Sequence, residues 1–144
     1  MDEQLLAGFL RGEVSAAELG PALLEARLHP DSPTFKTSAN YRVVPLASAV
    51  KVAPAQIDRL VSAVESGQLS EDQAGIAAFL LESGLDRFQW DTDTVDGERV
   101  GKVLFWLGMP VINYPLTPRN LAAMREYLRT GKPMPDDNSE RAGA

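Results

Sequence analysis

Apolar residues recur at helical spacing in six segments of the chain, and polar turns separate these segments. The clearest case is the set Ile57, Leu60, Val61 and Val64, which lie at i, i+3, i+4 and i+7 and so share one face of a helix. Pro54 suits the first position of that helix. The same spacing, with glycine and proline as stop signals, predicts helices over residues 2–12, 15–28, 54–67, 70–84, 97–107 and 117–131, the second of them kinked or restarted at its Gly-Pro step.

Two stretches, "RGEVSAAE" at 11–18 and "SGQLSEDQ" at 66–73, follow the same order of residue types. Each combines a helix stop, a short turn and a serine, Ser15 or Ser70, followed three residues later by Glu or Gln. That spacing is typical of a capping box, in which the serine side chain accepts a hydrogen bond from the first helical turn. Both stretches therefore predict a joint between two antiparallel helices, and either independent use of favoured turn residues or an internal duplication explains the likeness.

These patterns predict a mainly α fold, a single-domain bundle of about six helices. We expect the domain to span residues 1–132 and the polar, proline-rich tail at 133–144 to be disordered. Residues 29–46 hold three prolines and no helical period, so they form a long connection, with one short strand segment near 41–44 as an alternative within it.

Composition excludes several kinds of chemistry. The 144 residues contain no cysteine, which excludes disulfides, thiolate catalysis and zinc sites built from cysteine. The N-terminus lacks the basic region of a signal peptide, and no apolar run reaches the roughly 18 residues of a membrane span. We therefore expect a cytoplasmic protein that is not bound to a membrane.

The charge of the chain is unevenly distributed. Residues 58–98 hold ten acids and two bases, whereas the rest of the chain holds ten acids and twelve bases, and the formal net charge is −6. A surface of this sign repels nucleic acid and attracts basic proteins. The last predicted helix has a basic edge, but a solvated helix face explains it better than nucleic-acid binding does.

The stretch "DTDTVDGERVG" at 91–101 has the look of a calcium loop. Counted from Asp91, however, it departs from the EF-hand pattern at positions 5, 6 and 12, and position 12 supplies the bidentate glutamate that closes the coordination sphere. We therefore predict no metal site and no cofactor. A loose magnesium site that uses Asp91 and Asp93 stays open as an alternative.

Helix capping explains much of the same stretch. With Asp96 as the N-cap, Val95 and Val100 take the positions of a hydrophobic staple, and Glu98 falls in the first turn, where the helix dipole favours an acid. Glu98 and Lys102 also form an i, i+4 pair of the favourable orientation. Capping leaves Asp91 and Asp93 unexplained.

No catalytic group is evident. The lone histidine, His29, precedes a proline at a predicted helix end, and no serine lies in a G-x-S-x-G elbow. The chain also contains no P-loop and no G-x-G-x-x-G motif. We therefore predict a protein that is not an enzyme.

Two aromatic residues, Phe88 and Trp90, alternate with polar residues and then meet the acids. They either cover the edge of the core or form an aromatic anchor beside a negative rim, as in protein-binding surfaces. The leading hypothesis is a binding module of the inhibitor, antitoxin or immunity type that covers a basic site on a partner protein such as a toxin or nuclease. The predicted contact residues are Asp86, Phe88, Trp90, Asp91, Asp93, Asp96 and Glu98.

Two other hypotheses compete with this one. The first is a divalent-ion-dependent enzyme or sensor that uses Asp91, Asp93 and Asp96. The second is a regulatory or assembly adaptor that forms a homodimer through the helix at residues 71–82, whose small residues permit close packing.

Overall fold

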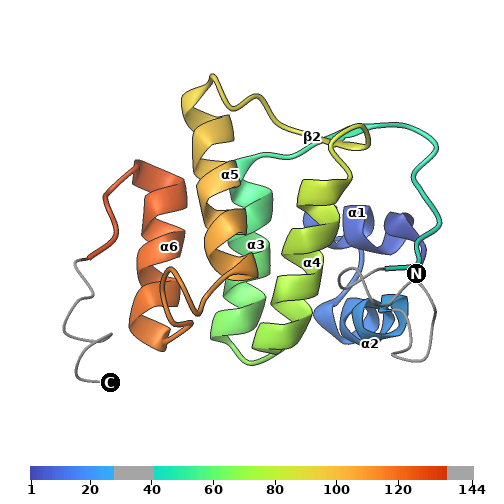
Figure 1. Cartoon of the computed structure of the whole chain (residues 1–144), viewed down its shortest axis with the longest axis horizontal. Helices are drawn as coiled ribbons and strands as arrows, with labels where there is room; N and C mark the ends of the chain where they lie inside the picture. The colour runs from blue at the N-terminus through green and yellow to red at the C-terminus, as the bar shows by residue number, and fades with distance from the viewer. Residues whose placement is uncertain (28–40, 136–144) are drawn as a thin grey trace.

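Six helices form a bundle in the computed structural model, which describes residues 1–27 and 41–135 (Figure 1). The predicted fold class, a mainly α single-domain bundle, is confirmed. The elements follow one another as α1 (Glu3–Arg11), α2 (Ala16–Ala26), β1 (Val50–Lys51), α3 (Pro54–Glu65), α4 (Glu71–Ser83), β2 (Phe88–Gln89), α5 (Val95–Gly108) and α6 (Pro118–Thr130). Residues 28–40 and 136–144, and with them His29 and most of the predicted tail, lie outside the described residues.

Helix α3 is the centre of the bundle, because it packs against α1, α4, α5 and α6. Its predicted inward face is fully buried at Ile57, Leu60 and Val61. Helices α4 and α5 lie side by side in Figure 1, α6 flanks them at one end, and α1 with α2 lies at the other. Burial of these apolar faces, at about 25 cal/mol per Å² of apolar surface, is the main force that holds the helices together.

The two joints predicted from the repeated pattern share the same backbone hydrogen bonds, but the capping box is complete only at Ser70, where Gln73 accepts from the Ser70 N–H. In the first, the backbone N–H groups of Glu13 and Val14 both donate to the carbonyl of Gly8, and in the second the equivalent groups at 68 and 69 both donate to Ala63. Ser15 and Ser70 cap the following helices as predicted, each accepting from the backbone N–H three residues on. The likeness of the two stretches therefore extends from residue type to hydrogen bonding.

Helix α2 continues through Pro21, so the restart that was predicted as one of two alternatives does not occur. It runs unbroken from Ala16 and ends at Ala26, two residues earlier than expected. Pro21 removes the hydrogen bond to the carbonyl of Ala17, and both residues lie on the exposed side of the helix, where water can satisfy that carbonyl.

The short strand segment forms elsewhere than at residues 41–44, where only isolated bridges occur at Tyr41 and Val44. Strands β1 and β2 pair in parallel, with Val50 opposite Phe88. The N–H of Val50 donates to the carbonyl of Arg87 at 2.8 Å, and the N–H of Val52 donates to Gln89 at 2.8 Å. This pairing ties the segment before α3 to the segment that leads into α5.

Candidate protein-binding surface

The acidic stretch before α5 folds into a compact loop held by Asp91 and Thr94. The side-chain carboxylate of Asp91 accepts from the backbone N–H of Asp93 at 2.9 Å. The backbone carbonyl of Asp91 accepts from the Thr94 hydroxyl at 2.6 Å. The Thr94 oxygen in turn accepts from the N–H of Gly97 at 3.0 Å. Asp91, which capping left unexplained, therefore shapes the loop.

Thr94, rather than Asp96, is the N-cap of α5, so the predicted helix start was wrong by two residues. The Thr94 hydroxyl can accept from the first turn and donate to Asp91 at once, which a carboxylate at 96 cannot do. Val95 consequently becomes the first helical residue, is 64% exposed, and forms no staple with Val100. The predicted Glu98–Lys102 pair is confirmed at 3.0 Å.

Phe88 does not belong to the surface. It lies in β2 and is 0% exposed, among the largest fully buried side chains. The alternation of Phe88 and Trp90 with polar residues would place both on one face of a strand, but β2 ends at Gln89. Only Trp90, which is half-buried, reaches solvent beside the acidic loop.

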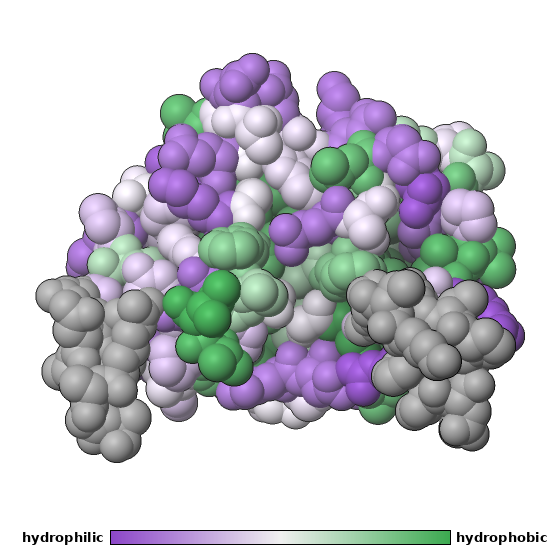
Figure 2. Space-filling model, in the orientation of Figure 1, coloured by the Kyte–Doolittle hydropathy of each residue, from purple (hydrophilic) through white to green (hydrophobic). Residues whose placement is uncertain are grey.

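The five acids of the predicted site are all exposed but differ in their surroundings. Asp86 pairs with Arg87 at 2.9 Å, and Glu98 pairs with Lys102. Within residues 1–27 and 41–135, Asp91, Asp93 and Asp96 form no ion pair, and the Asp93 and Asp96 carboxylates accept no hydrogen bond. Figure 2 shows hydrophilic residues gathered over the N-terminal end of α5, where this loop lies.

These acids do not all point the same way. Asp96 lines a hollow with Arg99 and Arg129, between α5 and the ends of α3 and α6. Glu98 and Val95 line a different hollow beside Trp106. Trp90 lies on the α4 side of α5, so the predicted residues surround the helix end instead of forming one flat patch.

A groove beside Trp90 contains residues that the sequence did not single out. Glu82, Leu85, Gln89, Thr92 and Gly101 line it together with Trp90, and Leu85 is 57% exposed. Leu85 follows the glycine that ends α4, so helical spacing says nothing about its direction. The signal available in the sequence was an apolar residue, Leu85, just after a helix end and close to Trp90 and the acids.

Glu82 is half-buried in this groove, and burial raises the pKa of its carboxyl. A carboxyl whose pKa is higher in the folded chain favours folding only while protonated. Its contribution is complete below the unfolded pKa of about 4.3 and is lost as the pH rises through the folded pKa.

Replacing Glu82 by glutamine should therefore raise the melting temperature at neutral pH, because the charged carboxylate is the disfavoured form. The gain over the native chain should shrink toward zero as the pH falls to about 4. Circular-dichroism melts of both proteins across this range measure the difference. An equal or lower melting temperature for Glu82→Gln at pH 7 would contradict the assignment.

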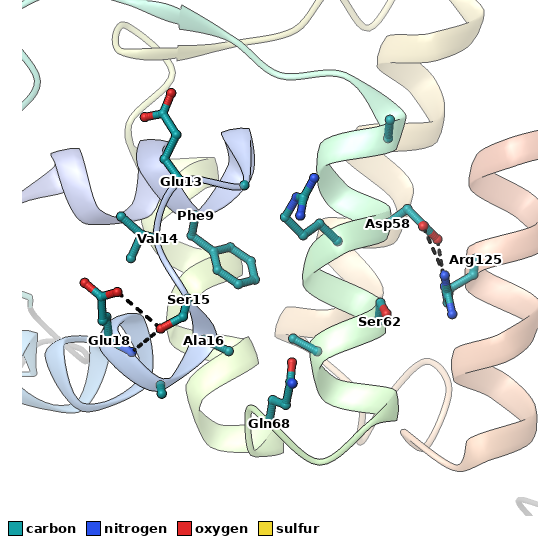
Figure 3. Close-up of a pocket in the computed structure, with 15 residues that line it drawn as sticks. Phe9, Glu13, Val14, Ser15, Ala16, Glu18, Asp58, Ser62, Gln68 and Arg125 are labelled. Atoms are coloured by element: carbon teal, nitrogen blue, oxygen red, sulfur yellow. Dashed lines mark hydrogen bonds and ion pairs between the residues drawn. The ribbon is translucent and has the colours of Figure 1, made fainter.

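A larger hollow, of about 790 Å³, lies between the α1–α2 turn and α3 (Figure 3). Two pairs of its polar groups lie within hydrogen-bond distance of each other. The Ser15 hydroxyl lies 3.3 Å from the Glu18 carboxylate, and Asp58 is held by Arg125 on the far side of α3. The Ser15 oxygen also accepts from the backbone N–H of Glu18, so this serine serves as the N-cap of α2.

Two observations bear on the competing hypotheses of a divalent-ion site and of a dimer formed through the helix at residues 71–82. In the described part of the chain, no group of three or more acidic or histidine side chains is placed to hold a metal ion. The small residues of α4 are used inside the fold: Ala74, Ala77 and Ala78 are buried, and Gly75 approaches the backbone of Leu107 in α5. They are therefore not available as a dimer face.

The predicted basic edge of α6 is largely occupied within the molecule. Arg125 donates to Asp58 at 2.9 Å and to Glu65 at 2.8 Å, so that it joins α6 to α3. These two carboxylates raise the pKa of the Arg125 guanidinium above its ordinary value. Lys132 lies 3.9 Å from Glu126.

Scans against protein-family models, curated proteins and solved structures find no match to this chain. Among the described residues, none of the helices has the length and apolar character that crossing a membrane requires. The geometry of the surface is thus the basis for assigning a function.

Proposed function

We propose that this protein is a non-enzymatic binding module that covers a basic site on a partner protein. The observation that carries the proposal is the segment 91–96, which comprises the loop before α5 and the start of its first turn. It presents three exposed carboxylates that form no ion pair in the described part of the chain, those of Asp91, Asp93 and Asp96. Two apolar side chains, Trp90 and Leu85, line a groove beside it. An apolar anchor with a charged rim is the usual anatomy of a protein-binding surface.

The finer proposal is an inhibitor, antitoxin or immunity-type protein. Such proteins must reach their target quickly, and exposed charge of one sign speeds association with a partner of the opposite sign. The hydrogen bonds of Asp91 and Thr94 tie the backbone of this segment to the start of α5, which limits the entropy lost when a partner binds.

Replacing Asp91, Asp93 and Asp96 together by asparagine should slow association with the partner roughly tenfold or more at low salt. It should also flatten the dependence of the association rate on salt, because fewer charges steer the encounter. An asparagine side chain at position 91 can still accept from the N–H at 93 through its amide oxygen, so the loop is kept. The partner is first isolated as the protein that the native chain retains from an extract of its source organism. Association rates of this partner with each variant are then measured on a sensor surface across a salt series.

The matched control is the triple variant of Glu13, Glu18 and Glu25 to glutamine, which changes the net charge equally on the exposed surface of the α1–α2 turn and of α2. It should slow association far less. Equal slowing by the two triple variants would reduce the effect to net charge alone, and unchanged kinetics in the asparagine variant would contradict the proposal.

A further inference from the structure

Helix α5 carries glycine at two positions that lie next to residues lining the groove beside the acidic loop. Gly101 leaves room next to the Trp90 indole: a side-chain carbon there would lie 3.5 Å from the indole nitrogen. Gly108, two turns later on the same face, leaves room for Glu82, whose Oε1 would lie 3.6 Å from such a carbon. Phe105 lies on this face between the two glycines and is 45% exposed.

Glu82 is a half-buried acid without a cationic partner among residues 1–27 and 41–135. Four carboxylates in the described ranges are not fully exposed, and three of them have a cation: Glu3 has Arg87, Asp58 has Arg125 and Glu126 has Lys132. Glu82 forms no ion pair and no hydrogen bond with any described residue. A carboxylate that loses water and gains no cation is unfavourable unless something else binds it.

The surroundings of Glu82 suit a cation that is carried on an apolar stem. The walls, Leu85 and Trp90, are apolar and would contact a hydrocarbon stem, while the carboxylate would hold a positive head. A guanidinium is planar, stacks on an indole and donates two parallel hydrogen bonds to one carboxylate. An ammonium has no such plane.

We infer that this groove binds an arginine side chain of the basic partner, with the guanidinium at Glu82 and against Trp90. The inference rests on the proposed function, since it supplies the specific contact that the diffuse acidic loop lacks. The loop would speed the encounter, and the groove would hold the complex once it has formed.

The test uses N-acetylarginine amide as the probe and the full chain labelled with nitrogen-15. Titration should shift the Trp90 indole N–H and the Gly101 amide in nuclear magnetic resonance spectra and reach saturation. The Trp106 indole, which packs against Tyr114 and Tyr127, is an internal control and should not shift. N-acetylcitrulline amide, which has nearly the same shape without the charge, should cause no saturable shift.

Two variants that remove one negative charge each separate the groove from the general acidity of the surface. Glu82→Gln should lower the affinity for the probe roughly fivefold or more, because the charge-assisted hydrogen bonds are lost. Asp93→Asn, on the exposed loop, should leave its affinity within roughly twofold. Equal weakening by both variants, or shifts centred on residues 91–96 that survive in Glu82→Gln, would overturn the inference.

The outcome for the groove can be read apart from the outcome for the proposed function. With the partner itself, Glu82→Gln should speed dissociation and leave the association rate unchanged, whereas the Asp-to-Asn triple variant should slow association. If the triple variant slows association but Glu82→Gln has no effect, the inference about the groove is wrong and the proposed function is still supported. If the arginine probe binds as expected while the triple variant associates normally, the proposed function is wrong and the groove stands.

Discussion

Replacing Arg87 by alanine should lower the free energy of unfolding by about 3 kcal/mol, or the melting temperature by about 10 °C, because it strands the buried carboxylate of Glu3. Glu3 is 1% exposed, and its two oxygens accept from the Arg87 guanidinium at 2.6 and 3.1 Å. The same carboxylate accepts from the N–H of Leu46 at 3.0 Å. Because Arg87 is itself 25% exposed, the cost should fall near the lower end of the range for buried pairs. Denaturant unfolding of both proteins measures it.

A second variant shows whether the cost comes from a stranded charge. In the double variant Glu3→Gln with Arg87→Ala, the amide oxygen can still accept from Leu46, and no charge is buried. The double variant should therefore be more stable than Arg87→Ala alone. The control is Arg27→Ala, which removes an exposed pair with Asp72 and should cost less than about 1 kcal/mol. A double variant less stable than the single one would contradict the buried-charge explanation.

The helices could be predicted from the sequence because their signals are local. Ser15 and Ser70 cap the residues next to them, and the face of Ile57, Leu60 and Val61 follows from spacing alone. These features depend on residues within about one or two helical turns. The structure confirms both the serine caps and the buried face of α3.

Several features that the sequence did not predict depend on contacts across the chain. Nothing near Glu3 shows that an arginine 84 positions later lies against it, so its burial had no signal in the sequence. Phe88 could be core or surface until its pairing with Val50 was known. Helical spacing groups Phe79 with the buried Ile76 and Leu80, but Phe79 is 43% exposed and packs against Tyr41, with ring centroids 4.9 Å apart.

The candidate site was half predictable for the same reason. The distribution of charge along the sequence located the acidic segment 58–98, and the exposure of Asp91, Asp93 and Asp96 follows from their charge. The groove, by contrast, exists only because α4 and α5 are side by side, which brings Glu82 next to Gly108 and Trp90 next to Gly101. No spacing rule joins residues that belong to different elements.

Replacing Gly97 by alanine should destabilise the protein by about 3 kcal/mol, although alanine is the better helix former by about 1 kcal/mol. Gly97 is buried in the first turn of α5, and a side-chain carbon there would overlap the carbonyl of Asp91. That carbonyl cannot move alone, because it accepts from both the backbone N–H and the hydroxyl of Thr94. The substitution should therefore also cost the cap, about 1 kcal/mol. Chemical denaturation measures the total.

The matched control lies one turn further along the same helix. In Gly101→Ala the new carbon makes an ordinary contact with the Trp90 indole at 3.5 Å, so this variant should gain up to about 1 kcal/mol from helix propensity. Opposite signs for the same substitution in one helix can arise only from the neighbours of each glycine. If Gly97→Ala were as stable as the native chain, the loop that presents Asp91, Asp93 and Asp96 would be able to move away from α5. The rigidity that favours fast, specific binding by this loop would then be absent.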